Sequence, residues 1–461
     1  MELSKQYISD LKSTGNSDIS AFLSRANAPE VLFFLENLGF LPKSFDGDLL
    51  VPLINHHNAN IRFWTIKNLG KIHSDKYLEI LYTLAQNDQD TSVRREAVSS
   101  IGRLRSYKSI EKLIELLNDY DPKIVSQAIR GLLVFKNDSN VQKELKKLIQ
   151  HPNEVIQSVI KKEFFSNENK SNGEKIEPLI SPDYLKNVVV NGDVLDVLKY
   201  VPDESIHLTF TSPPYYNARD YSIYPSYQDY LNFLEVVFKE VHRITKEGRF
   251  FILNTSPIII PRVSRSHSSK RYPIPFDIHP FLIKMGWEFI DDLIWLKPEA
   301  SVKNRIAGFM QHRKPLAYKP NATTEYLMVY RKQTDKLLDW NMRHYDYKKV
   351  QESLVPEGYE TSNVWKIDPT FDKIHSAVFP IELCKRVIQY YSYVHDLVFD
   401  PFGGSGTVGK TAKKLDRYFF LTEKNPDYFN YMKSHQKQSS FDDKFYSKFF
   451  TIEQFKEIIK K

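Results

Sequence analysis

The residues most able to do chemistry stand at the end of a predicted strand. Residues 206–211 (IHLTFT) alternate apolar and polar positions, which predicts a strand with one buried face. Ser212, Pro213, Pro214 and Tyr215 follow, and the prolines predict a stiff turn because they fix φ and lack backbone donors. The serine hydroxyl and a proline carbonyl can accept hydrogen bonds from one NH2 group, while the tyrosine can stack on a planar ring. An ordinary strand-ending turn with a buried tyrosine would contain the same residues, so this turn alone leaves both interpretations open.

A second chemical motif is a glycine-rich turn between a predicted strand and a predicted helix. Residues 397–399 (LVF) predict a buried strand, and DPFGGSGT at 400–407 leads into a helical run. Glycines at such a turn let a ligand approach the backbone at a helix N-terminus. A further strand at 418–421 leads to Glu423, whose carboxylate is placed to bind ribose hydroxyls. The same turn contains a GxGxxG pattern, but a dinucleotide-binding dehydrogenase would leave the serine-proline turn unexplained.

Taken together, the two motifs resemble the amino-methyltransferase family of DNA modification enzymes over roughly residues 186–433. The target-base motif precedes the cofactor motif, which is the permuted order of the family's beta group. Asn191-Gly192-Asp193 stands where the family has an acid that contacts adenine, and 375–383 (HSAVFPIEL) is similar to the segment that covers the methionine moiety. Residues 295–298 and 324–330 match later strands of the family.

The resemblance implies S-adenosyl-L-methionine as cofactor and assigns two groups of residues. The target amine would be held by Ser212, Pro213, Pro214 and Tyr215. The cofactor would be bound by Asp193, Thr211, Phe379, Pro380, Asp400, Pro401, Phe402, Gly403, Gly404, Ser405, Gly406, Thr407 and Glu423. A β-branched side chain at Gly403 or Gly406 is expected to fill the space that the cofactor occupies.

The resemblance also implies the fold of this region, an α/β Rossmann-like methyltransferase domain with a doubly wound, mostly parallel sheet. From Val188 onward, short β-branched or aromatic runs alternate with amphipathic stretches, which is typical of such a sheet. The permuted order predicts that 188–190 pairs early and that 397–399 takes a central place late in the chain. Both ligands should then lie at the carboxyl ends of the strands.

The methylated atom is expected to be N4 of cytosine in duplex DNA. Methylation at carbon-5 needs a cysteine nucleophile, and the only cysteine, Cys384, follows a leucine in a predicted amphipathic helix. In the family, serine before the two prolines is associated with cytosine N4, whereas aspartate is commoner for adenine N6. Transfer is expected to be direct and in line, with no metal ion. An adenine-N6 enzyme, an RNA substrate, and a non-catalytic scaffold that only binds nucleic acid remain as alternatives.

Residues 1–165 predict an all-α domain of HEAT-like repeats. Similar segments are anchored at Ile61, Val93, Ile124 and Val155, which lie 32, 31 and 31 residues apart, and residues 1–50 predict additional capping helices. The repeats could dock a protein, such as a cognate restriction or defence protein. Alternatively they could contact DNA through the arginines of a concave face, which are Arg62, Arg94, Arg95, Arg103 and Arg105.

The polar segment 166–182 predicts a linker, and 183–461 predicts the methyltransferase domain with two basic inserts, 262–272 and 297–349. The second insert has 12 Lys and Arg against 5 Asp and Glu. Interleaved aromatic residues suit contacts with double-stranded DNA, although a solvated basic loop remains the alternative. The candidate DNA-binding residues are Arg219, Arg262, Arg265, Lys270, Arg271, Lys297, Lys303, Arg305, Arg313 and Lys314.

Composition is consistent with these expectations. The chain has 461 residues with a net charge of +7, and 41% of its residues are hydrophobic, so it can bury a core and take a polyanionic partner. A single cysteine excludes a disulfide framework and a cysteine-rich metal site. The N-terminal sequence lacks an apolar signal region and no segment predicts a membrane span, so we expect a cytoplasmic protein, part of a restriction-modification or related defence system.

Overall fold

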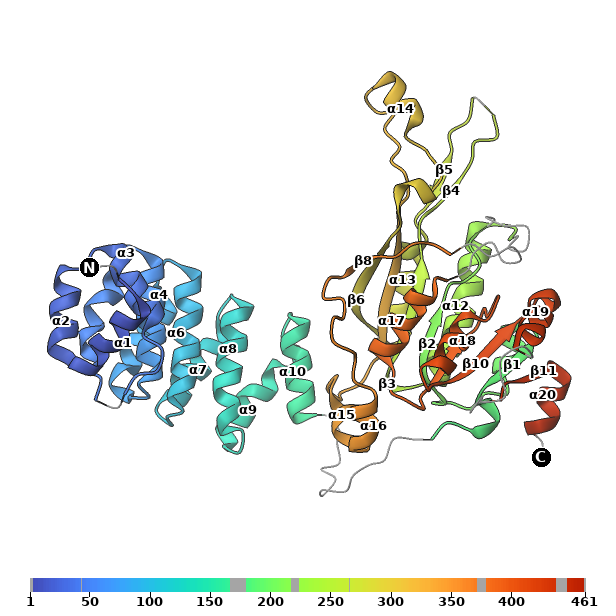
Figure 1. Cartoon of the computed structure of the whole chain (residues 1–461). Helices are drawn as coiled ribbons and strands as arrows, with labels where there is room; N and C mark the ends of the chain where they lie inside the picture. The colour runs from blue at the N-terminus through green and yellow to red at the C-terminus, as the bar shows by residue number, and fades with distance from the viewer. Residues whose placement is uncertain are drawn as a thin grey trace. The chain divides into compact units, whose positions relative to one another are not determined.

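The computed structural model describes residues 3–42, 44–165, 180–216, 224–264, 266–370, 379–436 and 446–459. The chain divides into two compact units, Met1–Ser171 and Asn172–Lys461 (Figure 1). Most of the segment predicted as a linker lies outside the described residues, and so do Arg219 and Arg265. No helix of the described part is both long enough and apolar enough to cross a membrane.

The first unit is helical, and its helices form the expected HEAT-like repeats. Three N-terminal helices precede the repeats: α1 (Lys5–Thr14), α2 (Asn16–Arg25) and α3 (Ala28–Asn37). The repeats follow as α4 (Ala59–Lys71), α5 (Leu78–Asn87), α6 (Thr91–Leu104), α7 (Ser109–Glu115), α8 (Pro122–Leu132), α9 (Ser139–Lys147) and α10 (Glu154–Phe164).

A capping side chain sets the register of every second repeat helix. Asn58, Asp90, Asp121 and Asn153 each accept hydrogen bonds from backbone N–H groups of the first turn of α4, α6, α8 and α10. The third residue after each of the first three caps is the fully buried Ile61, Val93 or Ile124. In α10 that position is Ile156, which is 1% exposed, whereas Val155 is 59% exposed. The sequence-based choice of Val155 as the fourth anchor is therefore wrong by one residue.

Three of the arginines proposed for a DNA-contacting face are committed to ion pairs within the repeats. Arg62 contacts Asp88 at 2.8 Å, Arg95 contacts Asp121 at 2.7 Å, and Arg94 pairs with Asp119. A fourth, Arg103, pairs with Glu96, while Arg105 is exposed at the C-cap of α6. The first three pairs each join a helix to a neighbouring inter-helix turn, and the Arg103–Glu96 pair lies within α6. Four of the five arginines are thus held within the stack, and the expectation that they form a free phosphate-binding face is not supported.

The second unit contains a nine-stranded sheet in the order β11-β1-β10-β9-β2-β3-β7-β6-β8. Its strands are β1 (Val188–Asn191), β2 (Ile206–Thr211), β3 (Thr245–Thr255), β6 (Trp287–Leu296), β7 (Thr324–Lys332), β8 (Val364–Lys366), β9 (Leu397–Asp400), β10 (Tyr418–Glu423) and β11 (Lys448–Thr451). All neighbouring pairs are parallel except those that β7 makes with β3 and β6. The mostly parallel sheet is confirmed, and β9 lies at its centre between β10 and β2, as the permuted order predicts.

Alternating strand residues supply a core on each face of the sheet. In β1, Val188 and Val190 face one core, and Val189 faces the other. The first core is covered by α11 (Val194–Leu198), α12 (Tyr227–Ile244), α13 (Ile274–Lys284) and α20 (Ile452–Ile459). The second is covered by α17 (Ile381–Tyr391), α18 (Thr407–Lys414) and α19 (Pro426–Gln436). Cys384 is buried in this second core, as expected for a packed thiol.

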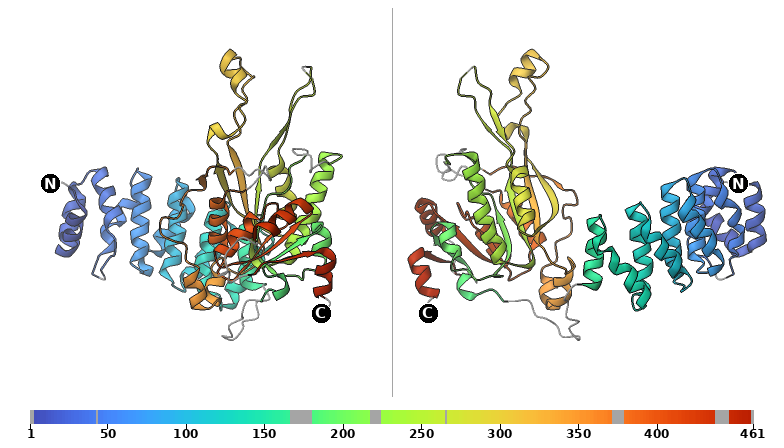
Figure 2. Two further views of the ribbon diagram at one scale, coloured as in Figure 1. Left: turned by 45° about the vertical axis from the view of Figure 1, so that its right-hand side comes forward. Right: turned by 180° about the vertical axis from the view of Figure 1, so that it is seen from behind.

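Two arms project from one end of the sheet (Figures 1 and 2). One is the antiparallel hairpin of β4 (Ile258–Ile260) and β5 (Lys270–Tyr272). Only 270–272 of the basic segment 262–272 lies in a strand, and the described residues 261–264 and 266–269 connect the two strands. The other leaves β6 and carries α14 (Ala307–His312). The segment 297–349 is therefore not a single insert, because its middle is the core strand β7. Its last part forms α15 (Trp340–His344) and α16 (Tyr347–Glu352), at the opposite end of the sheet from the arms.

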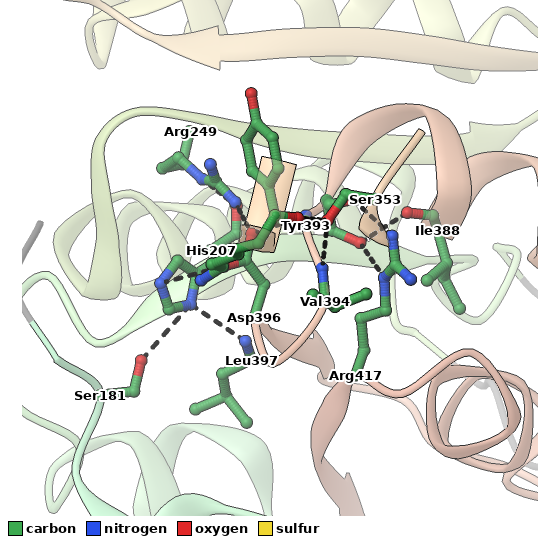
Figure 3. A network of polar contacts seen from close by, with 12 residues as sticks. Ser181, His207, Arg249, Ser353, Ile388, Tyr393, Val394, Asp396, Leu397 and Arg417 are labelled. Carbon is green, nitrogen blue, oxygen red and sulfur yellow. Dashed lines mark hydrogen bonds and ion pairs between the residues drawn. The ribbon is translucent and has the colours of Figure 1, made fainter. Parts of the chain in front are cut away.

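A buried polar network ties α16 to the start of the central strand (Figure 3). Asp396 pairs with Arg249 of β3 and with Lys349 of α16, whose Nζ lies 3.0 Å from Oδ1. Burial opposes ionisation of Asp396, but these cations dominate and lower the pKa of its carboxyl. The neighbouring His207 accepts the Leu397 N–H through Nδ1 at 3.0 Å, and burial lowers the pKa of its ring. The ring is thus neutral, with the proton on the nitrogen that faces Asp396.

Candidate active site

A single cavity of about 1050 Å³ lies at the carboxyl ends of the central parallel strands. Residues from both sequence motifs line it, although about 190 residues separate the motifs. β2 and β9 are neighbours in the sheet, and the Thr211 hydroxyl at the end of β2 donates to Asp400 Oδ1 at the end of β9 over 2.6 Å. This bond joins the start of one motif to the start of the other. The lining residues from the motifs are Ser212, Pro213, Pro214, Tyr215, Asp400, Pro401, Phe402, Gly403, Gly404, Ser405, Thr407 and Glu423.

The glycine turn is held to strand β10 by backbone hydrogen bonds. Gly403 N donates to Thr422 O over 2.9 Å, and Gly404 N donates to Glu423 Oε2 over 2.7 Å. Gly404 has a φ of +51°, in the left-handed region that favours glycine. Phe402 N donates to Asp400 Oδ1 over 3.0 Å, so the Asp400 carboxylate both shapes the turn and borders the cavity.

Gly406 has a different role from the one expected. It lies at the N-terminus of α18 with a φ of +78°, and it does not line the cavity. A Cβ atom there would meet Met432 Sδ at 2.7 Å. The expectation that a side chain at Gly406 would fill the ligand space is therefore wrong, because the glycine serves a close contact between the turn and α19.

The cofactor half of the cavity contains two carboxylates without an ion-pair partner among the described residues. Burial raises the pKa of Asp400 to about 7, even though hydrogen bonds from Thr211 and Phe402 lower it. Burial also raises the pKa of Glu423, whose oxygens accept the N–H groups of Gly404 and Asn425. Two desolvated acids in one cavity favour a ligand that brings positive charge and hydrogen-bond donors.

Other predicted cofactor residues fall into two groups. Asp193 and Phe379 line the cavity, and Asp193 also caps α11 and contacts Lys424 at 3.1 Å. Phe379 stacks on Phe210 with ring centroids 4.6 Å apart. Thr211 acts through Asp400, and neither it nor Pro380 lines the cavity. Residues 375–378 of the segment expected to cover methionine lie outside the described residues.

The other half of the cavity contains polar residues that sequence analysis did not assign to it. The Tyr215 hydroxyl donates to Glu325 Oε2 over 3.2 Å, and Glu325 also pairs with Lys297. Lys297 lines the cavity with 17% of its side chain exposed, so it lies apart from the other described candidates for DNA contact, which the arms carry. Glu325 is the second residue of β7, and Lys297 directly follows β6. An acid and a lysine at adjoining ends of neighbouring strands were the sequence signal that could have identified this pair.

The turn continues from Tyr215 into an aromatic cluster. Tyr216 is buried, and its ring centroid lies 5.3 Å from that of Tyr227 on α12 and 5.0 Å from that of Tyr272 on β5. Tyr227 donates to Asp277 of α13 over 2.8 Å. The residue after the motif thus connects the cavity to the projecting hairpin.

The arms carry most of the described cations predicted to contact DNA. Arg262, Lys270, Arg271, Lys303, Arg313 and Lys314 are exposed, and Arg305 is half-buried. Burial and the nearby charge of Arg271 lower the pKa of Arg305, so the two arms bring like charges close together. Close like charges favour a polyanionic ligand between or along the arms.

The doubly wound sheet, with a glycine turn and a serine-proline turn facing one cavity, places the second unit among the Rossmann-like methyltransferase folds. Among the described residues no group of three or more His, Cys, Asp or Glu side chains is arranged to hold a metal ion.

Comparison with known proteins gives the family. The DNA methylase family matches residues 206–434, and HEAT repeats match 47–102 and 78–161. The orphan methyltransferase M.BamHII of Bacillus amyloliquefaciens is 30% identical over 245 residues, which cover 50% of this chain and 87% of the relative. The chain belongs to the DNA methylase family, whose methyl donor is S-adenosyl-L-methionine.

Two further similarities show the extent of the match. The type II beta methyltransferase M.BslI of Bacillus sp. (strain NEB-606) is 31% identical over 251 residues, covering 52% of this chain but only 26% of the relative. The chain thus spans about a quarter of the length of that relative. The structure of PvuII DNA methyltransferase (cytosine-N4-specific) aligns with 62% of this chain and 94% of its own, with a TM-score of 0.42 and 22% identity.

Proposed function

We propose that this chain transfers a methyl group from S-adenosyl-L-methionine to N4 of cytosine in duplex DNA. The observation that carries the proposal is the Thr211–Asp400 hydrogen bond, which fixes the amine-holding turn and the cofactor turn at one cavity. A cavity of about 1050 Å³ has room for a cofactor and an extruded base together. Ser212, in place of an aspartate, favours cytosine as the base.

The carboxylates of the cofactor half fit this cofactor because it supplies positive charge next to the methyl group that is transferred. Asp400 would hold its amino group, and Glu423 would accept hydrogen bonds from its ribose hydroxyls. Glu423 keeps lone pairs for this purpose, since each of its oxygens accepts one backbone N–H and can accept another donor. Phe402, which borders the cavity, adds an apolar wall.

The half of the cavity lined by Ser212, Pro213 and Tyr215, here called the amine half, would orient the target base. Ser212 and the Pro213 carbonyl would accept the two N–H bonds of the target amine, and Tyr215 would stack on the ring. An exocyclic amine is a poor nucleophile because its lone pair is delocalised into the ring, so orientation out of the ring plane is the main contribution. A well-oriented pair of reactants can gain roughly 7–11 kcal/mol.

We propose that the two arms grip the DNA duplex. The exposed cations of the β4–β5 hairpin and of the α14 arm would contact phosphates, and the arm tips would reach base edges in a groove. For the HEAT-like unit we propose protein docking, with a restriction or defence protein as partner. That proposal is supported by the arginine–aspartate pairs, which commit three of the five candidate arginines to contacts within the stack.

Nucleoside mass spectrometry after incubation of DNA with the protein and isotope-labelled cofactor tests the reaction. The expected product is N4-methylcytosine, and Ser212→Ala should lower turnover more than it lowers DNA affinity. Detection of N6-methyladenine alone would show that the target base is adenine and not cytosine. Methylation of RNA but not of duplex DNA would overturn the substrate, and no product on either would favour a non-catalytic scaffold.

A further inference from the structure

A carboxylate faces the amine half of the cavity and has no part in the function proposed so far. Glu325 is the second residue of β7, and only 14% of its side chain is exposed. Its Oε2 accepts the Tyr215 hydroxyl at 3.2 Å, and its Oε1 pairs with Lys297. Glu325, Lys297 and Tyr215 all line the same cavity as Ser212.

The Tyr215 hydroxyl donates one hydrogen bond and accepts another. Burial keeps the phenol protonated by raising its pKa, and the bond from Tyr215 to Glu325 acts in the same sense. A side-chain hydrogen bond also joins Ser212 to Tyr215. The phenol has one proton and donates it to Glu325, so in the bond with Ser212 the phenol oxygen accepts and the serine hydroxyl donates. The donors therefore run in one order, from Ser212 to Tyr215 and from Tyr215 to Glu325.

Methylation of an amine requires a proton acceptor. As the new N–C bond forms and the S–C bond breaks, the sulfonium becomes a neutral thioether, and the amine nitrogen must lose one proton. In the proposed function Ser212 accepts a hydrogen bond from this amine, but a serine is too weak a base to keep the proton. The serine can accept it only if its own proton moves on.

We propose that Glu325 is the terminal acceptor of the proton released from the target amine, by way of Ser212 and Tyr215. The amine proton passes to Ser212 Oγ, the serine proton passes to Tyr215 Oη, and the tyrosine proton passes to Glu325 Oε2. Every oxygen on the path gains one proton and loses one except Glu325, which ends neutral. The positive charge of the sulfonium and the negative charge of the carboxylate disappear together, so charge balances.

The other charged groups around the cavity are less suited to this role. Asp400 and Glu423 lie in the cofactor half and accept hydrogen bonds from Thr211 and from backbone N–H groups. The charged or titratable side chains that contact Glu325 are Lys297, after β6, and Tyr215, in the turn after β2; the β3 residue lining this side of the cavity, Asn254, is neutral. Lys297 stays beside the carboxylate as its ion-pair partner.

This inference rests on the proposed function, and its test uses the full chain with saturating DNA and cofactor. In a single-turnover methyl-transfer assay, Glu325→Gln should lower the rate about 10²-fold or more, the range of general-base contributions. Tyr215→Phe keeps the stacking ring and cuts the path, so it should lower the rate to a similar degree. Glu299→Gln is the matched control. Glu299 lies two residues after Lys297, is exposed and does not line the cavity. Cofactor and DNA dissociation constants should stay within about twofold in all three variants.

A second measurement separates proton acceptance from a purely structural role. The methyl-transfer rate of the unsubstituted chain should show a solvent deuterium isotope effect, because protons move along the relay as the methyl group is transferred. This isotope effect should be lost in Tyr215→Phe and in Glu325→Gln, whereas loss of a purely structural contact would lower the rate and leave the isotope effect in place.

Three outcomes decide the matter. A Glu325→Gln rate close to that of the unsubstituted chain would overturn the relay while leaving the methyltransferase proposal intact. A solvent isotope effect that persists in Glu325→Gln would also overturn it, since Glu325 would then only position Tyr215. Absence of any methylated base with the unsubstituted chain would instead refute the proposed function itself.

Discussion

The raised pKa of Asp400 predicts that cofactor affinity depends on pH. Burial raises this pKa to about 7 in the free chain, so near neutral pH about half of the molecules carry a neutral Asp400. A cationic cofactor prefers the ionised form and lowers the pKa when it binds. Affinity should therefore rise with pH and level off above about pH 8. Between about pH 8 and pH 6 the dissociation constant should increase about tenfold, which corresponds to about 1.4 kcal/mol.

The same shift gives a stability prediction of known sign. The folded-state pKa lies above the ordinary value of 3.8, so the contribution of Asp400 to stability is fully present below that value and is lost as pH rises through about 7. The cofactor-free chain should thus melt at a lower temperature at about pH 8 than at about pH 5. Saturating cofactor should oppose this loss at the higher pH, because it stabilises the ionised carboxylate.

Isothermal titration calorimetry at about pH 6, 7 and 8 measures the effect. Asp400→Asn is the matched variant, because it keeps the size of the side chain but cannot titrate. It should bind more weakly at all three pH values and show little pH dependence. A pH-independent affinity in the unsubstituted chain, or an equal pH dependence in Asp400→Asn, would refute the assignment of Asp400 to the cationic end of the cofactor.

Four further predictions follow from other parts of the molecule. Gly406→Val should lower the melting temperature, because its side chain meets Met432 and its backbone has a positive φ, whereas folded protein should still bind cofactor in calorimetry. Asp396→Asn leaves buried cations unpaired and should cost about 3–5 kcal/mol in urea denaturation. By contrast, Asp183→Asn at an exposed ion pair should cost at most about 1 kcal/mol. A chain beginning at Glu174 should bind cofactor and match the full chain in DNA affinity at equal salt; a clear drop would return DNA contacts to the HEAT-like unit. Changing Arg262, Lys270 and Arg271 together to Gln should reduce the salt dependence of DNA binding by about 0.9 per lost phosphate contact, and an unchanged slope would exclude the hairpin from the interface.

The motifs and their meeting point could be predicted from sequence because each depends on local chemistry. The prolines after Ser212 and the glycines after Asp400 specify turns by themselves, and alternation in 206–211 specifies a strand. The central place of β9 followed from the order of the motifs, since a permuted chain must return to the middle of its sheet.

Features that depend on tertiary contacts could not be predicted in the same way. Net charge made 297–349 resemble one basic insert, but β7 within it is apolar enough to cross the core, and Glu325, its second residue, lines the cavity. Lys297 was assigned to DNA because a lysine next to basic residues has no sequence signal for its partner 28 positions later. In α10, hydrophobicity alone placed the buried anchor one residue too early. The capping residue Asn153 fixes where the helix begins and hence which residue is buried.

The aromatic cluster around Tyr216 has a consequence for how this enzyme can change during evolution. Tyr272 belongs to the hairpin that would touch DNA, and Tyr216 adjoins the residue that would stack on the target base. A substitution that changes the orientation of the hairpin, so that it contacts a new DNA sequence, would therefore also disturb the residues next to the cavity. New specificities should be easier to acquire through the α14 arm, which shares no ring contact with this cluster among the described residues, than through the hairpin.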